Sequence, residues 1–126
     1  MFRQIWQRII NLWRQIQRHF RKRAPPPPKP TPIWNSLGIA LSDLGRNSEA
    51  IAAYEKALEI DPKFHMAWNG LGNALYDLGH YSEAIAAYEK ALEIDPKFHI
   101  AWNSLGIALS DLGRNSEAIA AYEKAL

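Results

Sequence analysis

Histidine and cysteine are the side chains that most often build metal and catalytic sites, and this 126-residue chain offers few of them. Cysteine is absent, so no disulfide, thiolate metal site or cysteine nucleophile can form. Two of the four histidines, His65 and His99, stand 34 residues apart at the same position of a repeated segment and form no chelating motif. The sequence also lacks a zinc-protease motif, a phosphate-binding glycine loop and a nucleophile elbow. It therefore predicts a protein that is not an enzyme and that uses no cofactor and no metal ion.

Amide and carboxylate side chains, by contrast, recur at intervals of 34 residues. The recurring residues are Asn35, Asn69 and Asn103, and Asp43, Asp77 and Asp111. Amides can donate to and accept from the backbone of an extended peptide, and a row of carboxylates favours a basic or neutral ligand. Two alternatives stay open: the asparagines recur only because the units were copied, and the carboxylates form a solvated charged surface. These residues point to binding and not to a reaction.

The elements that must position these residues are repeated units. Residues 31–64 and 65–98 agree at 26 of 34 positions, and residues 34–58 recur without a change at 102–126. Self-similarity at such a period is typical of arrays of stacked supersecondary units. The chain therefore contains three units, of which the third, at 99–126, is cut short.

Each unit predicts a pair of helices. In the first unit Trp34, Leu37, Leu41 and Leu44 follow helical spacing, and Gly45 stands where a helix ends in a left-handed turn. A pair of this kind has an apolar face that only a neighbouring unit can bury.

The second helix of the pair is expected to begin at Ser48, which can act as its N-cap, with Glu49 in the positive first turn. It ends at Asp61 and Pro62. This Asp-Pro pair is also predicted to start the next helix, as N-cap and first helical residue. Gly38 removes side-chain bulk where the two helices of a unit must come close.

These residues resemble the tetratricopeptide repeat family. The resemblance covers about three quarters of the chain and implies an all-α fold, a right-handed α-solenoid of antiparallel helix pairs over residues 31–126. The matching residues are Trp34, Leu37, Gly38, Leu41, Ala50, Tyr54, Ala57 and Pro62; Trp68, Leu71, Gly72, Leu75, Ala84, Tyr88, Ala91 and Pro96; and Trp102, Leu105, Gly106, Leu109, Ala118, Tyr122 and Ala125.

The third unit departs from the family pattern, because it stops at Leu126 before the last proline and the solvating helix. We expect apolar surface to stay open there, at Leu109, Leu112, Ala118, Ile119, Tyr122 and Leu126. Such a surface invites further repeats, a homo-oligomer formed through this end, or the reading of the chain as a fragment of a larger enzyme.

The resemblance also implies a concave groove lined by the first helices, which binds a protein or peptide. The residues placed there are Asn35, Ile39, Ser42 and Asp43; Met66, Asn69, Asn73, Tyr76 and Asp77; and Ile100, Asn103, Ile107, Ser110 and Asp111. Some family members clamp the C-terminal carboxylate of a chaperone with Lys, Arg and Asn. The matching positions here are Asn35, Ile39, Gly70, Ile100 and Ser104, so every charged donor is missing and that ligand is disfavoured.

The N-terminal segment has a different charge from the repeats: residues 1–32 carry eight Lys or Arg and no acid. From residue 2 to residue 20, apolar and basic side chains separate onto two sides of a helix roughly 30 Å long. Its residues include Phe2, Ile5, Trp6, Ile9, Trp13, Ile16 and Phe20 on one side, and Arg3, Arg8, Arg14 and Arg18 on the other. No apolar run is long enough to span a bilayer.

The basic helix, at residues 1–23, suits an anionic membrane surface on which it lies flat. A helix that caps the repeats or pairs with a copy of itself is the main alternative, and nucleic-acid binding is unlikely because no base-reading motif accompanies it. Residues 24–32 predict a stiff polyproline linker. The sequence thus favours a cytoplasmic interaction scaffold, peripheral at a membrane, over a soluble self-associating array.

Overall fold

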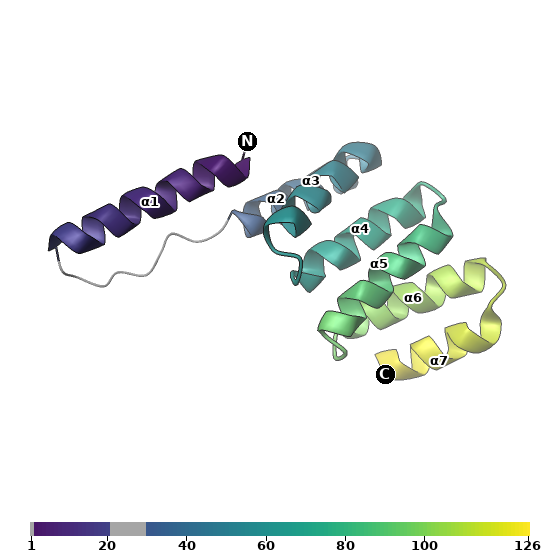
Figure 1. Cartoon of the computed structure of the whole chain (residues 1–126). Helices are drawn as coiled ribbons and strands as arrows, with labels where there is room; N and C mark the ends of the chain where they lie inside the picture. Colours follow the sequence, from purple (N-terminus) through teal and green to yellow (C-terminus); the bar gives the residue numbers. More distant parts are fainter. Residues whose placement is uncertain (1, 21–29) are drawn as a thin grey trace. The chain divides into compact units, whose positions relative to one another are not determined.

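The protein is described by a computed structural model of residues 2–20 and 30–126, in which all regular elements are helices (Figure 1). The chain divides into two compact units, residues 1–30 and residues 31–126. The prediction of an all-α solenoid is confirmed. The helices are α1 (Phe2–Phe20) in the first unit and, in the second, α2 (Thr31–Asp43), α3 (Asn47–Ile60), α4 (His65–Asp77), α5 (Tyr81–Ile94), α6 (His99–Asp111) and α7 (Asn115–Ala125).

The turn inside each helix pair depends on a glycine. Gly45, Gly79 and Gly113 have φ values of 77°, 82° and 77°, the left-handed region that favours glycine. In the first pair, Arg46 donates its backbone N–H to the Leu41 carbonyl at 2.9 Å, which satisfies the end of α2. The predicted role of Gly45 is confirmed.

Two predicted helix starts are wrong. No side chain caps α3: the helix begins at Asn47, and Arg46 precedes it and forms an ion pair with Glu49. Asp61 and Pro62 do not start α4 either. The Asp61 carboxylate accepts the Lys63 backbone N–H at 3.1 Å and so builds a separate turn, after which α4 begins at His65.

The two helices of each pair approach closely at a glycine that faces a tyrosine ring. A Cβ added at Gly38 would lie 2.6 Å from Tyr54 Cε1, and one added at Gly72 would lie 2.6 Å from Tyr88 Cε1. Tyr88 is 2% exposed and is the largest side chain buried to this degree. Glycine is therefore required here for space.

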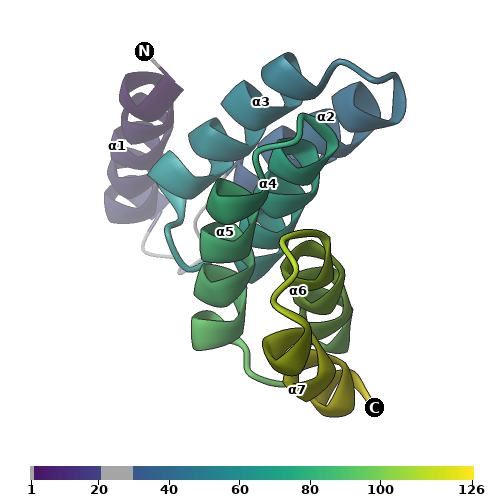
Figure 2. The ribbon, with the colours of Figure 1, turned by 90° about the vertical axis from the view of Figure 1, so that its right-hand side faces the viewer.

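The pairs stack so that the first helices of successive units touch: α2 contacts α4, and α4 contacts α6. Figure 2, turned from the view of Figure 1, shows α2, α4 and α6 following one another along one side of the stack. We call the side of the stack that α2, α4 and α6 share, which the resemblance predicts to be concave, the concave surface.

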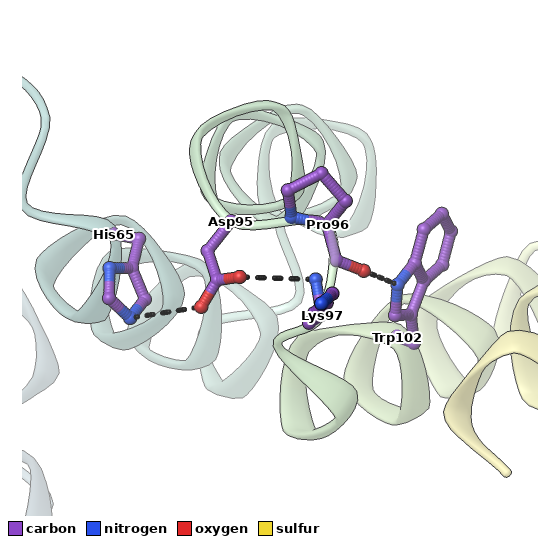
Figure 3. Close-up of polar contacts among 5 residues, drawn as sticks. All are labelled: His65, Asp95, Pro96, Lys97 and Trp102. Carbon is purple, nitrogen blue, oxygen red and sulfur yellow. Dashed lines mark hydrogen bonds and ion pairs between the residues drawn. The ribbon is translucent and has the colours of Figure 1, made fainter.

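Figure 3 shows the joint between the second and third helix pairs. Asp95 accepts the Lys97 backbone N–H at 3.1 Å with Oδ1 and lies 3.7 Å from His65 Nε2 with Oδ2. The indole N–H of Trp102 donates to the Pro96 carbonyl at 2.8 Å. Because Trp102 is in α6 and His65 in α4, the joint fixes successive first helices to the same turn.

The N-terminal segment is described in part. Helix α1 covers Phe2–Phe20, and the predicted linker at 24–32 lies outside the described residues up to residue 29. Its last two residues belong to α2, which begins at Thr31 with Pro32 in the first turn, where a missing N–H costs no hydrogen bond. Thr31 and Pro32, which the expected linker and the expected array at 31–126 both included, thus lie in a helix.

Candidate functional site

The concave surface is the candidate site, and it carries aliphatic side chains in each unit. Ile39, Met66, Ile100 and Ile107 are all exposed, although they are large and apolar. No lysine or arginine occurs in α2, α4 or α6. The surface is thus apolar in part and acidic in its charge.

The three predicted groove asparagines are not equivalent. Asn35 and Asn69 are each 8% exposed, and their side-chain oxygens are buried without a hydrogen-bond partner among the described residues. Asn103 is exposed. Of these three amides, a ligand on this surface could reach the whole side chain only at Asn103. The three asparagines therefore do not form a row of equivalent hydrogen-bonding groups.

The acidic row, by contrast, lies at the surface, with Asp43, Asp77 and Asp111 all exposed. Asp111 is joined to the unit before it, because the Tyr76 hydroxyl donates a hydrogen bond to its carboxylate. This bond to Asp111 raises the pKa of Tyr76 to about 12, and partial desolvation and the nearby charges act in the same direction. The structure therefore brings together two of the predicted groove residues, one from α4 and one from α6.

The side chain of Asn73, which was expected to contact a bound peptide, forms a hydrogen bond within the array. Its side-chain oxygen accepts the Tyr88 hydroxyl at 2.7 Å. Burial raises the pKa of the Tyr88 phenol well above its ordinary value. Ser42 is also engaged, since its hydroxyl donates to the Asn47 side chain at 3.2 Å. Both predicted groove residues therefore already have hydrogen-bond partners within the array.

Sequence reasoning missed Tyr81, which stands on α5 and contacts the predicted groove residue Tyr76. Its ring lies 5.1 Å from the Tyr76 ring, centroid to centroid, at an interplanar angle of 51°. Tyr81 also lines a hollow of about 260 Å³ with neighbouring residues of the α4–α5 turn and Leu112. Its position at the first residue of α5 gave no helical periodicity that would have linked it to α4.

The C-terminal end of the array contains a second hollow, of about 530 Å³, which is mostly apolar. Ile119 is 58% exposed there, and Leu112 and Leu126 are exposed as expected. Leu109 and Ala118, also expected to be open, are instead buried, because they pack in the core between α6 and α7.

The basic helix α1 is the other candidate surface. Four of its aliphatic residues, Ile5, Ile9, Leu12 and Ile16, are exposed and share one side at helical spacing, whereas Ile10 is buried. None of the described helices is long and apolar enough to cross a lipid bilayer. Within residues 2–20 and 30–126, no three His, Cys, Asp or Glu side chains gather closely enough to hold a metal ion.

Several solved structures resemble about three quarters of this chain. A crystal structure of MamA is 30% identical, with a TM-score of 0.72 over 75% of this chain and 56% of that chain, so the present chain spans just over half of that protein. The first and second tetratricopeptide repeat domains of Spaghetti (RPAP3), each bound to the HSP90 peptide SRMEEVD, are 23% and 21% identical, with TM-scores of 0.75 and 0.74. They cover 76% and 75% of this chain, and 76% and 88% of their own.

The comparison with family models agrees with the structural one. The model described as the tetratricopeptide repeat matches residues 35–97 and again residues 71–126. Among curated proteins, no sequence matched. Together the two ranges include most of α2 and all of α3 to α7, and this chain belongs to the tetratricopeptide repeat family.

Proposed function

We propose that the chain is an interaction scaffold that binds a peptide or a helix of another protein on the concave surface of α2, α4 and α6. The observation that carries this proposal is the exposure of Ile39, Met66, Ile100 and Ile107, which all stand on the first helices of the units. Large aliphatic side chains that gather on one surface and face water are a common feature of binding sites.

The solved relatives support a peptide as the ligand. Two structures with the same fold, both from RPAP3, hold a short peptide. The identity of that peptide does not transfer, because the present groove has no lysine or arginine on its first helices. The test of the proposal is to map where a bound peptide changes the backbone amide signals of the chain.

We propose a second role for α1, the reversible attachment of the scaffold to an anionic membrane. The supporting observation is its apolar side, on which Leu12 is 59% exposed, opposite a side with four arginines at 3, 8, 14 and 18. A helix of this kind lies in the membrane interface, where apolar burial and attraction to anionic lipids act together.

Replacing Ile9 with glutamate in the full chain is expected to reduce co-sedimentation with phosphatidylserine-containing liposomes about tenfold or more, because a carboxylate would enter the apolar interface. Asn11→Glu is the matched control: it adds the same charge on the opposite side of α1, and we expect a reduction of about threefold or less. Unchanged co-sedimentation of the Ile9→Glu variant, or equal co-sedimentation with neutral and anionic liposomes, would contradict the membrane role.

A further inference from the structure

The middle unit differs from its two neighbours at a few positions that lie close together in the sequence. Residues 34–58 and 102–126 are identical, and the corresponding residues 68–92 depart from both at five positions. The departures are Gly70, Asn73, Tyr76, His80 and Tyr81, which replace Ser, Ile, Ser, Arg and Asn. Residues 70, 73 and 76 follow one face of α4 at intervals of three, and the other two continue into the turn and the start of α5.

These changes concentrate aromatic groups at the centre of the array. The ring centroids of Tyr76 and Tyr81 lie 5.1 Å apart, and the ring planes are tilted by 51°. Both side chains are half-buried, so each keeps exposed surface that a ligand can contact. The Tyr76 hydroxyl donates to Asp111 of the next unit, which fixes that carboxylate beside the ring pair. At the equivalent position of the first unit, the Ser42 hydroxyl donates instead to Asn47 within its own unit.

The two carboxylates near this ring pair lie at helix ends where a negative charge is unfavourable. Asp77 and Asp111 are the last residues of α4 and α6, where the helix dipole is negative and a cation is preferred. Neither helix has a basic residue in its last turn. A bound cation would relieve this local conflict, and conflicts of this kind are expected at functional sites.

We propose that Tyr76, Tyr81, Asp77 and Asp111 form a position that selects a lysine or arginine side chain of the bound peptide. This inference rests on the proposed peptide-binding function and specifies its ligand. A cation over a tyrosine ring is attracted by the ring's negative face, and the carboxylates provide acceptors for its N–H groups.

The neighbouring units specify the residues on either side of that cation. At the position of Asn73, the flanking helices α2 and α6 carry the exposed residues Ile39 and Ile107. Adjacent helices are about 10 Å apart, and an extended chain advances about 3.3 Å per residue. The preferred peptide therefore has a basic residue with aliphatic residues about three positions before and after it.

The experiment uses four fluorescein-labelled heptapeptides with the sequence Leu-Ser-Gly-X-Ser-Gly-Leu, where X is arginine, lysine, norleucine or glutamate. Binding to the full chain is measured by fluorescence anisotropy at low salt. We expect the arginine and lysine peptides to bind about tenfold more tightly than the norleucine peptide, and the glutamate peptide to bind most weakly.

The double variant Tyr76→Ser, Tyr81→Asn converts the ring pair to the residues that the flanking units already carry in the same fold. It should remove the preference for a basic residue while binding of the norleucine peptide changes by less than about twofold. Asp111→Asn should reduce the preference about threefold or more, whereas Glu93→Gln, which removes the same charge on α5, should leave it unchanged.

The results separate this inference from the function on which it rests. If all four peptides bind equally, or the double variant keeps the preference for arginine, the cation position is wrong while peptide binding stands. If none of the four binds, the cation position fails together with peptide binding by this surface.

Discussion

Replacement of Tyr88 with alanine is expected to lower the free energy of unfolding of the array, residues 31–126, by about 3–5 kcal/mol. Tyr88 is 2% exposed and belongs to the core formed by α5, α6 and α7, so its removal leaves a cavity between the second and third units. It also removes the hydrogen bond to Asn73, which joins α5 to α4. Few single substitutions in the array combine these losses.

The measurement is urea unfolding of the full chain followed by far-ultraviolet circular dichroism, which reports the helices directly. Tyr88→Phe is the matched control, because it keeps the ring and loses only the hydroxyl, at a cost of about 1 kcal/mol. A loss below about 1.5 kcal/mol for the alanine variant would show that the middle of the array is not tightly packed around Tyr88.

Replacement of Gly72 with valine is expected to destabilise the array by about 3 kcal/mol. The new Cβ alone would lie 2.6 Å and 2.7 Å from two ring carbons of Tyr88, and this ring is buried and cannot turn away. The helices α4 and α5 would have to separate. Gly72→Ala should have a smaller effect, because the better helix propensity of alanine recovers about 1 kcal/mol.

Gly79 provides the positional control for this prediction. No heavy atom lies within 4 Å of a Cβ added there, but its φ of 82° disfavours most side chains. Gly79→Asn should cost less than about 1 kcal/mol, since asparagine tolerates the left-handed region. Equal unfolding midpoints in urea for Gly72→Val and Gly79→Asn would contradict the close approach of α4 and α5.

The sequence was sufficient to predict the helix pairs, because their signals repeat three times at a fixed interval. The glycine at Gly45 and its equivalents marked each turn, and the small volume of Gly38 indicated a close approach of two helices, where the structure places the Tyr54 ring. Each of these features depends on residues of one unit, so short-range patterns contain the information.

Helix starts and inter-unit contacts were harder to predict, for two physical reasons. Asp61 could cap a helix by type, but its carboxylate has a nearer donor in the Lys63 N–H. The bond from Tyr76 to Asp111 joins residues 35 apart and depends on how two units are rotated against each other. The burial of Asn69 likewise follows from stacking and not from residue type.

The divergence of the middle unit also changes how the copied sequence is understood. If the asparagines and aspartates recurred only by duplication, the later differences should be scattered over all surfaces. The differences between the second unit and its neighbours instead lie along α4 and its turn, at Asn73, Tyr76 and Tyr81 among others. The proposed cation position accounts for two of the five differences, Tyr76 and Tyr81, whereas Gly70 is buried against the Tyr54 ring.

The most direct test of the account is to record backbone amide shifts of the ¹⁵N-labelled full chain while the arginine heptapeptide is added. We predict the largest changes on the concave surface, at Ile39, Tyr76, Asn103, Ile107 and Asp111, and small changes along α3, α5 and α7 apart from Tyr81. Changes that instead concentrate on the outer helices, or the absence of changes at saturating peptide, would contradict binding on the concave surface.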